Sequence, residues 1–367
     1  MPLPLIDSFE KFLIFGFTLS LLVVVHECGH FFVARRNGVA VCEFGVGFGP
    51  ALLSIRSRRS GTRYRLNAIP LGGYCAMLGE DTRRESPEAP IALSGGEYSA
   101  RAPWRRFAIV AAGPVVNLVA AFAILLLSVL LVGIPSDRSS TRVGKVIAGD
   151  PAERAGLRTG DEITAIDGKP VHDGTAMVRE INGSLGKTLI VTYRHHGLPR
   201  RVRLTPIPIT AHGRKIGITG FMPLTEYTRV SPQASIAAAA SETVQMWNST
   251  MSGLTDLLLH ASTAGDELVG PVGMARAAVA IQDYGLGAYL WFAAFISLNL
   301  GIFNLLPIPA LDGGRILFIL VEVVRGRPID PEKEAAVHMT GFAALIAIVL
   351  FRTYHDIINM VAGKSAI

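Results

Sequence analysis

The residues most able to do chemistry are His26, Glu27 and His30, which stand in the sequence His-Glu-Cys-Gly-His. On a helix, side chains four positions apart lie on one face, so the two histidines can bind the same Zn²⁺ ion. Glu27 lies beside them and can take a proton from a water molecule bound to that ion. The pattern therefore predicts a zinc site with Glu27 as the general base. Cys28 points to another side of the helix, and we expect it to be a packing residue.

A catalytic zinc site normally has three protein ligands and leaves a fourth position to water. The strongest candidate for the third ligand is Asp312, a carboxylate within an otherwise apolar segment. Pro307 and Pro309 remove backbone donors before it, and Gly313 and Gly314 permit unusual backbone angles after it, so the helix should be interrupted here. At membrane depth, an interrupted helix is tolerated only against protein or water. The alternative is a simple kink, with Asp312 as a helix cap.

The composition indicates a membrane protein. Half of the 367 residues are hydrophobic and only 17% are charged, against about 25% in soluble proteins. The apolar residues gather in four runs, each long enough to cross roughly 30 Å of hydrocarbon: 12–34, 107–134, 288–324 and 339–361. Ionisable groups in the first run cost on the order of 3 kcal/mol each in a bilayer, so a metal site explains them better than two core histidines do.

Basic residues indicate which side of the membrane each loop faces. Arginines cluster between the first and second runs, and more basic residues lie between the third and fourth, whereas the termini have few. By the positive-inside rule these loops face the cytoplasm, and the termini and the segment 135–287 face outward. The net charge of +6 therefore indicates cytoplasmic loops and no nucleic-acid partner. Three cysteines without paired spacing exclude a disulfide-stapled fold.

The outward segment begins with a small folded domain. Short apolar strands bounded by Gly and Asp lie at 143–147, 162–168 and 188–193, and residues 144–168 look like the core of a PDZ domain. Residues 232–261 are rich in Ala, Ser and Met, which indicates a long amphipathic helix that does not span the membrane. The predicted segments are 1–36, 37–106, 107–134, 135–210, 211–287, 288–324, 325–338, 339–361 and 362–367.

Together these motifs resemble the site-2 proteases, specifically the bacterial RseP/RasP-type zinc metalloproteases of regulated intramembrane proteolysis, in peptidase family M50. The similarity covers nearly the whole chain. In two positions the chain departs from the pattern: Arg315 stands where many relatives carry His, and Cys28 replaces an aliphatic residue. Neither change removes a ligand or the base. The motifs that carry the resemblance are the stretches 26–30, 43–50, 70–74, 77–80, 112–117, 270–274 and 299–314.

The resemblance implies the ligands and base already named, together with a substrate site shaped by the third apolar run. The amide of Asn304 could hold a peptide carbonyl, or it could bond the helix carbonyls that the break sets free. The residues implied in substrate binding on this run are Asn299, Asn304, Pro307 and Pro309.

The resemblance also implies a membrane-associated β-hairpin after the first span. Residues 41–48, with Gly45 and Gly47, fit this region. An exposed strand edge there could capture an unwound substrate by strand addition. The alternative is a glycine-rich loop that merely packs closely.

We therefore expect a multi-pass α-helical membrane protein with about four transmembrane helices, a membrane-associated β region and one inserted α+β PDZ-like domain. The expected activity is intramembrane proteolysis that depends on Zn²⁺, in the bacterial cytoplasmic membrane. By resemblance, its substrates are single-pass membrane proteins, either anti-sigma factors first cut on the outer side by a site-1-type protease or remnant signal peptides. The PDZ-like domain is expected to exclude untrimmed substrates, with peptide binding as the alternative.

Two other functions fit part of the pattern. The chain could be a proteolytically silent scaffold that binds zinc and presents its PDZ domain, although retention of Glu27 disfavours this. It could also be a zinc or solute transporter. Transporters of that kind tend to show repeated halves and several polar clusters within the membrane, and the sequence shows neither.

Overall fold

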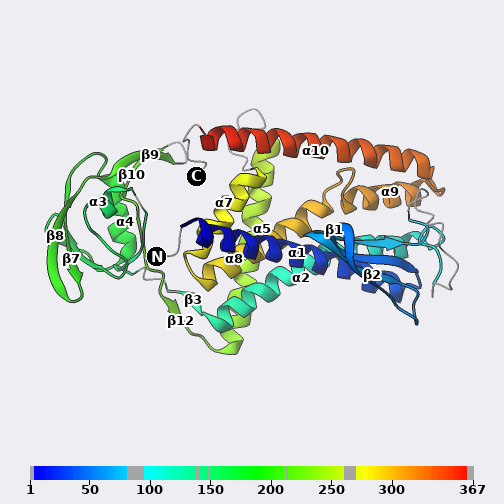
Figure 1. Cartoon of the computed structure of the whole chain (residues 1–367), viewed down its shortest axis with the longest axis horizontal. Helices are drawn as coiled ribbons and strands as arrows, with labels where there is room; N and C mark the ends of the chain where they lie inside the picture. Colours follow the sequence, from blue (N-terminus) through cyan, green and yellow to red (C-terminus); the bar gives the residue numbers. More distant parts are fainter. Residues whose placement is uncertain are drawn as a thin grey trace. The chain divides into compact units, whose positions relative to one another are not determined.

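The chain divides into two compact units in a computed structural model, which describes residues 4–80, 95–136, 140–147, 149–211, 214–259 and 270–361. The predicted tail 362–367 lies outside the described residues. The first unit comprises residues 1–127, 239–282 and 288–367, and the second comprises 128–238 and 283–287 (Figure 1).

Four helices are long and apolar enough to cross a membrane: Phe9–Arg36, Pro103–Leu131, Leu286–Leu305 and Pro331–Ile358. They belong to α1 (Pro4–Arg36), α2 (Pro103–Leu131), α8 (Leu286–Leu305) and α10 (Pro331–Val361). Other helices described in the first unit are α7 (Pro271–Gln282), α9 (Asp312–Arg325) and, from Ala239 on, α5 (Pro232–Leu259). The third apolar run thus forms two helices, α8 and α9, with an interruption at 306–311.

Glycines let the interrupted segment pack against the first turn of α9. An added Cβ at Gly313 would lie 2.1 Å from the Leu306 carbonyl oxygen, and one at Gly314 would lie 2.5 Å from that of Ile308. Neither glycine has a positive φ. The expectation that they supply unusual backbone angles was therefore wrong, because they supply space instead. The residue with the left-handed angle is Ala310, at φ 77°.

Helix α5 packs against the apolar helices over much of its length. Its residues Ala239 and Met246 share a buried cluster with Ala121 of α2 and with Ala294 and Leu298 of α8. Residues 239–282 accordingly belong to the first unit. The assignment of 211–287 to the outer side stays a prediction. Small side chains allow such close helix packing, and composition alone did not reveal it.

A small antiparallel sheet follows α1. Its strands β1 (Val41–Arg56) and β2 (Arg63–Met77) each bend, so that the sheet has four segments. Residues 41–46 pair with 63–66 on one side and with 73–77 on the other, while 51–56 pair with 63–67. Within the described residues, 73–77 therefore form one edge of this sheet.

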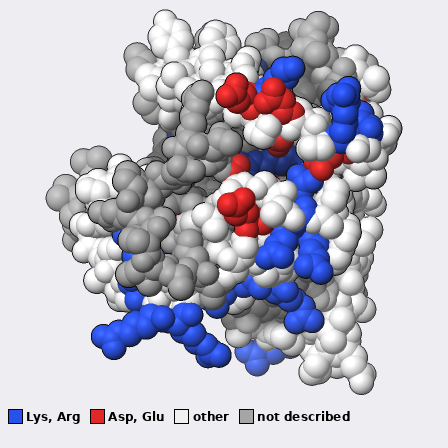
Figure 2. All heavy atoms as spheres, turned by 90° about the vertical axis from the view of Figure 1, so that its right-hand side faces the viewer, with Lys and Arg blue, Asp and Glu red and all other residues white. Residues whose placement is uncertain are grey.

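The edge segment 51–56 of β1 exposes apolar side chains and leads into a basic turn. Leu52, Leu53 and Ile55 are 70%, 55% and 58% exposed, which suits a surface in contact with lipid. Arg58 and Arg59 lie exposed in the turn between β1 and β2. Figure 2 shows basic side chains spread over this end of the molecule.

The second unit is an α+β domain with its own core. Its largest sheet has the order β6-β5-β7-β8, and buried residues such as Ile163, Met177 and Val191 pack inside it. Asp173 caps α4 by accepting a hydrogen bond from the Ala176 amide at 2.7 Å. The elements are β3 (Ile134–Pro135), β4 (Val143–Val146), α3 (Pro151–Arg154), β5 (Glu162–Ile166), β6 (Lys169–Pro170), α4 (Gly174–Gly183), β7 (Leu189–His195), β8 (Leu198–Leu204), β9 (Ile207–Ala211), β10 (Arg214–Ile218), β11 (Phe221–Pro223) and β12 (Tyr227–Thr228).

Candidate metal centre

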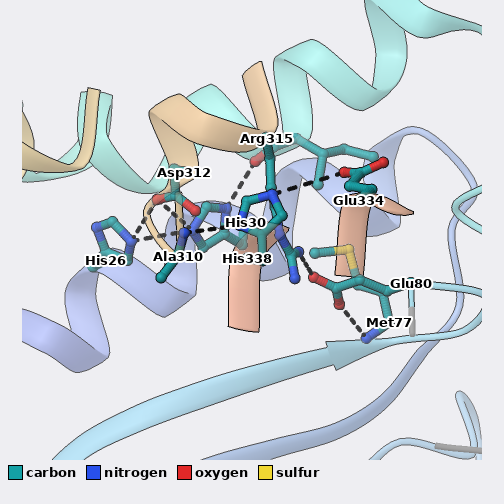
Figure 3. Close-up of polar contacts among 10 residues, drawn as sticks. His26, His30, Met77, Glu80, Ala310, Asp312, Arg315, Glu334 and His338 are labelled. Atoms are coloured by element: carbon teal, nitrogen blue, oxygen red, sulfur yellow. Dashed lines mark hydrogen bonds and ion pairs between the residues drawn. The ribbon is translucent and has the colours of Figure 1, made fainter. Parts of the chain in front are cut away.

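Two helices bring the predicted ligands together. His26 and His30 lie one turn apart on α1, and Asp312 is the first residue of α9 (Figure 3). The Nε2 atoms of the two histidines are 3.1 Å apart. Asp312 Oδ2 lies 3.0 Å from His26 Nε2 and 3.4 Å from His30 Nε2. Among the described residues, these three form the cluster whose ligand atoms all lie within 4.8 Å of one another.

The hydrogen bonds behind the ring of His30 fix which nitrogen faces the cluster. His30 Nδ1 lies 2.9 Å from the carbonyl oxygen of Ile109. A carbonyl can only accept, so Nδ1 carries the proton and Nε2 presents its lone pair to the cluster.

The side-chain amide of Asn117 lies behind His26, with its Nδ2 3.2 Å from His26 Nδ1. Asn117 is fully buried and its Oδ1 has no hydrogen-bond partner. Because amide O and N positions are interchangeable by a flip, the Asn117 carbonyl oxygen can equally accept a hydrogen bond from a protonated Nδ1. It then leaves His26 Nε2 free as a ligand.

The geometry fits a tetrahedral zinc ion. Bonds of about 2.0–2.1 Å to such an ion place neighbouring ligand atoms about 3.4 Å apart, close to the three distances found here. Asp312 Oδ2 is buried and has no hydrogen-bond donor. Two neutral imidazoles and a carboxylate present three lone pairs to one point, which is the donor set of a bound cation. His26, His30 and Asp312 therefore suit the ion that their spacing predicts.

Gly113 of α2 makes room for the two imidazoles. An added Cβ there would lie 2.3 Å from His30 Nε2 and 2.8 Å from His26 Nε2. Nearby, a Cβ at Gly29 of α1 would lie 2.5 Å from the carbonyl oxygen of Ala112. Gly113 and Asn117 were not predicted as site residues, although both lie in the stretch 112–117, which is one of the motifs shared with the family.

A cavity of about 290 Å³ opens beside the cluster, and Glu27, His26, His30, Asp312 and Asn304 all line it. The predicted residues Asn299, Pro307, Pro309, Gly45 and Gly47 are not among the described residues that line it. The other lining residues are Tyr74, Cys75, Met77, Glu80, Val110, Ala310, Leu311 and Arg315.

The two asparagines predicted to contact substrate both bond within α8. Asn304 Nδ2 donates to the Leu300 carbonyl at 2.9 Å, and Asn299 Nδ2 donates to that of Phe295 at 2.8 Å. Each bond joins the side chain to the carbonyl four residues earlier in the same helix, so neither uses a carbonyl of the interrupted segment. Asn304 also lies in the cavity wall, so its side-chain carbonyl oxygen can face a ligand.

Gly45 and Gly47 lie inside the sheet. The backbone at Gly45 pairs with Tyr74 on one side and with Arg65 on the other. The Gly47 carbonyl accepts a hydrogen bond from Asn67 at 2.8 Å. Gly45 therefore offers no free strand edge, and the Gly47 carbonyl is already bonded to a side chain. Gly45 is needed for packing instead, since a Cβ there would lie 2.3 Å from the Tyr74 ring.

Cys75 of β2 lines the cavity but does not belong to the cluster of candidate ligands. Burial raises the pKa of its thiol, and the negative charges of Glu27 and Glu80 raise it further. Cys75 is therefore a neutral thiol at physiological pH, and it serves as part of the wall.

Two further contacts hold the start of α9. Glu80 forms an ion pair with Arg315, and its other oxygen accepts a hydrogen bond from the Met77 amide at 3.1 Å (Figure 3). On the other side, His338 of α10 accepts a hydrogen bond from the Ala310 amide at 2.9 Å. Neither the Glu80–Arg315 contact nor the Ala310–His338 contact was predicted from the sequence, because only the fold brings these distant residues together.

Apolar helices around two histidines, a carboxylate and a neighbouring glutamate define a class of protein, the membrane metalloproteases. The chain belongs to peptidase family M50, whose family model matches residues 14–348. The predicted family, enzyme class and zinc cofactor are thereby confirmed.

Named relatives agree with this assignment. The chain is 30% identical over 419 residues to zinc metalloprotease RasP of Bacillus licheniformis, covering 94% of this chain and 97% of the relative. It is 29% identical over 410 residues to the regulator of sigma-W protease RasP of Bacillus subtilis, covering 92% and 95%. One similar solved structure is a PDZ domain of an SdrC-like protein from Listeria monocytogenes, with 24% identity, a TM-score of 0.21, and coverage of 25% of this chain and 94% of that one.

Proposed function

We propose that this zinc metalloprotease cleaves peptide bonds of single-pass membrane proteins within or next to the bilayer, with His26, His30 and Asp312 as the zinc ligands and Glu27 as the general base. The observation that carries the proposal is the convergence of three lone-pair donors, 3.0 to 3.4 Å apart, in a cavity that Glu27 also lines. This constellation suits hydrolysis by an activated water.

In the proposed reaction, Glu27 accepts and then donates the transferred proton. Zinc, when bound, lowers the pKa of a coordinated water and polarises the scissile carbonyl. The Glu27 carboxylate accepts the proton from the attacking water and returns it to the leaving nitrogen. Ile109 and Asn117 keep the two imidazoles oriented during this exchange through their contacts with the Nδ1 atoms.

The sheet edge at 73–77 is where we place the substrate backbone. Tyr74, Cys75 and Met77 of this edge line the same cavity as the candidate ligands. An extended peptide can add to such an edge through main-chain hydrogen bonds. A transmembrane helix must therefore unwind locally before cleavage, because its carbonyls are otherwise engaged in its own hydrogen bonds. Asn304 can accept or donate a hydrogen bond to the unwound segment from the opposite wall.

The outer α+β domain acts, in this proposal, as a size filter that admits substrates already trimmed outside the membrane. The likeness to the regulator of sigma-W protease RasP supports substrates of the anti-sigma-factor type, which an upstream protease shortens first. The exposed arginines of the turn at 57–62 support a cytoplasmic location for that loop. The enzyme would then lie in the bacterial cytoplasmic membrane, with its termini and the α+β domain outside.

The proposal is tested by comparing wild type with Glu27→Gln after purification in detergent. We expect both proteins to bind about one zinc per chain, because Glu27 is not a ligand. Cleavage of a single-span model substrate should fall by at least about 100-fold in the variant, the usual contribution of a general base. Equal cleavage by both proteins, or a wild-type protein that binds zinc and cleaves nothing, would contradict the mechanism. If the mechanism holds, cross-linking of bound proteins to the inactive Glu27→Gln variant identifies the natural substrate.

A further inference from the structure

The chain just before Asp312 has a conformation that needs outside support. Ala310 has a φ of 77°, which lies in the left-handed region that residues with a Cβ rarely adopt. Asp312 follows two residues later and begins α9 without any side-chain cap at Leu311. The direction of the Asp312 carboxylate therefore depends on how this short segment is held.

Helix α10 holds the segment through a histidine. The Ala310 amide donates a hydrogen bond to His338 Nδ1 at 2.9 Å (Figure 3). The His338 ring lies 5.5 Å from the ring of Phe318 on α9, and its Nε2 lies 4.0 Å from Glu334 one turn earlier on α10. His338 thus contacts both the interrupted segment and the helix that begins with Asp312.

A glycine on α10 makes a second contact with the same segment. Gly341 lies one turn after His338, and an added Cβ there would lie 2.4 Å from Pro309 Cβ and 2.8 Å from the Pro309 carbonyl oxygen. The absence of a side chain lets Pro309 lie directly against the helix. Two adjacent turns of α10 therefore contact two adjacent residues, Pro309 and Ala310.

The other end of α10 is also fixed. Asp356 Oδ2 accepts a hydrogen bond from the Gly273 amide at 2.9 Å, at the first turn of α7. A helix secured at this distant point can hold the segment at 309–310 in place rather than move with it.

We propose that His338 and Gly341 are positioning residues for the metal centre. By fixing the left-handed Ala310, they set the direction of the Asp312 carboxylate toward His26 and His30. This inference rests on the proposed role of Asp312 as a zinc ligand. Neither His338 nor Gly341 lines the cavity within the described residues, so both act through the backbone and not on the substrate.

The test measures zinc release from purified, zinc-loaded protein to an excess of chelator, without substrate. His338→Leu removes the acceptor for the Ala310 amide, whereas His338→Asn keeps an oxygen close to the position of Nδ1. We expect release at least about 10-fold faster for His338→Leu, in line with the loss of supporting contacts at other metal sites. His338→Asn should stay much closer to wild type. In cleavage assays kcat should fall in the leucine variant with little change in KM.

Gly341→Ala provides an independent variant, and Gly253→Ala of α5 is its matched control, since an added Cβ at Gly253 meets nothing within 4 Å. We expect faster zinc release for Gly341→Ala and the wild-type rate for Gly253→Ala. Thermal unfolding of the metal-free proteins shows whether any variant is misfolded. If His338→Leu is misfolded, zinc release from His338→Asn and Gly341→Ala tests the inference.

Wild-type release rates for His338→Leu and Gly341→Ala would overturn the inference, and so would equal acceleration by leucine and asparagine at 338. The proposed function would survive either result, because it requires only that wild type binds zinc and needs Glu27 for cleavage. A wild-type protein without zinc would instead remove the proposed function and this inference together.

Discussion

At the scale of single residues, the centre depends on groups that leave the imidazoles both room and direction. Gly113 provides the room, and Ile109 and Asn117 provide the direction through their contacts with Nδ1 of His30 and His26. Mutation of such supporting groups typically costs about 10- to 100-fold in metal affinity. The stretch 112–117 of α2 therefore serves the metal centre, although it supplies no ligand.

We predict that Gly113→Ala weakens zinc binding by on the order of 10- to 100-fold. The added methyl would lie 2.3 Å from His30 Nε2, so the ring must move away from the other two ligands. Zinc content after dialysis against graded chelator concentrations measures the effect. Gly253→Ala again serves as the control, because it adds the same methyl to a helix where the space is open. Unchanged zinc affinity in Gly113→Ala would show that the ring does not occupy the described position.

At the scale of elements, the sheet edge and the interrupted helix form opposite walls of one cavity. Residues 73–77 supply one wall, and residues 304 and 310–312 supply the other. The ion pair between Glu80 and Arg315 connects the two walls, since Glu80 also accepts from the Met77 amide. The strand that we propose to pair with substrate is thereby coupled to the helix that carries Asp312.

Strand pairing predicts a specific loss when backbone donors are removed from the substrate. A peptide-based substrate or inhibitor with N-methyl groups at alternate residues next to the scissile bond cannot make the ladder hydrogen bonds on one of its sides. We expect N-methylation on the side that faces residues 73–77 to raise KM or Ki by at least about 10-fold, roughly the 1.4 kcal/mol of one or two hydrogen bonds. N-methylation in the alternate register is the control. Equal effects in both registers would argue against strand addition.

At the scale of the whole molecule, the chain combines a unit that holds the apolar helices and the candidate metal centre with an α+β domain that has its own core. In the second unit, the described residues contain no cluster of candidate metal ligands. The role proposed for this domain is to select substrates, either as a steric filter or as a peptide-binding site, and these two roles predict different dependences of the cleavage rate on the substrate's outer segment.

We predict that cleavage depends on the bulk of the substrate outside the membrane. A model substrate with a short outer segment should be cleaved at least about 10-fold faster than one with a folded outer domain, a difference of about 1.4 kcal/mol in the activation barrier. The two substrates share the same transmembrane sequence, and a third substrate with an altered outer terminal residue controls for peptide recognition. Sensitivity to that terminal residue with no effect of bulk would instead favour the peptide-binding role.

The sequence by itself determined the chemistry. The spacing of His26, Glu27 and His30, the lone Asp312 and the apolar runs predicted a zinc site within a membrane, because ligand spacing on a helix and the thickness of a bilayer are local constraints. The resemblance of the motifs added the protease class. The interruption near Pro307 and Pro309 also followed from local backbone rules.

Only the tertiary structure decided which residues support that chemistry. Gly45 and Gly47 were predicted to contact substrate, but the pairing of the bent strands places Gly45 in the sheet interior and leaves residues 73–77 at the edge. Gly113 and Asn117 contact the two histidines, and His338 contacts the Ala310 amide, from helices far away in the sequence. Close approach and pairing between distant segments depend on how whole elements pack. The residue pattern within one element does not predict this packing.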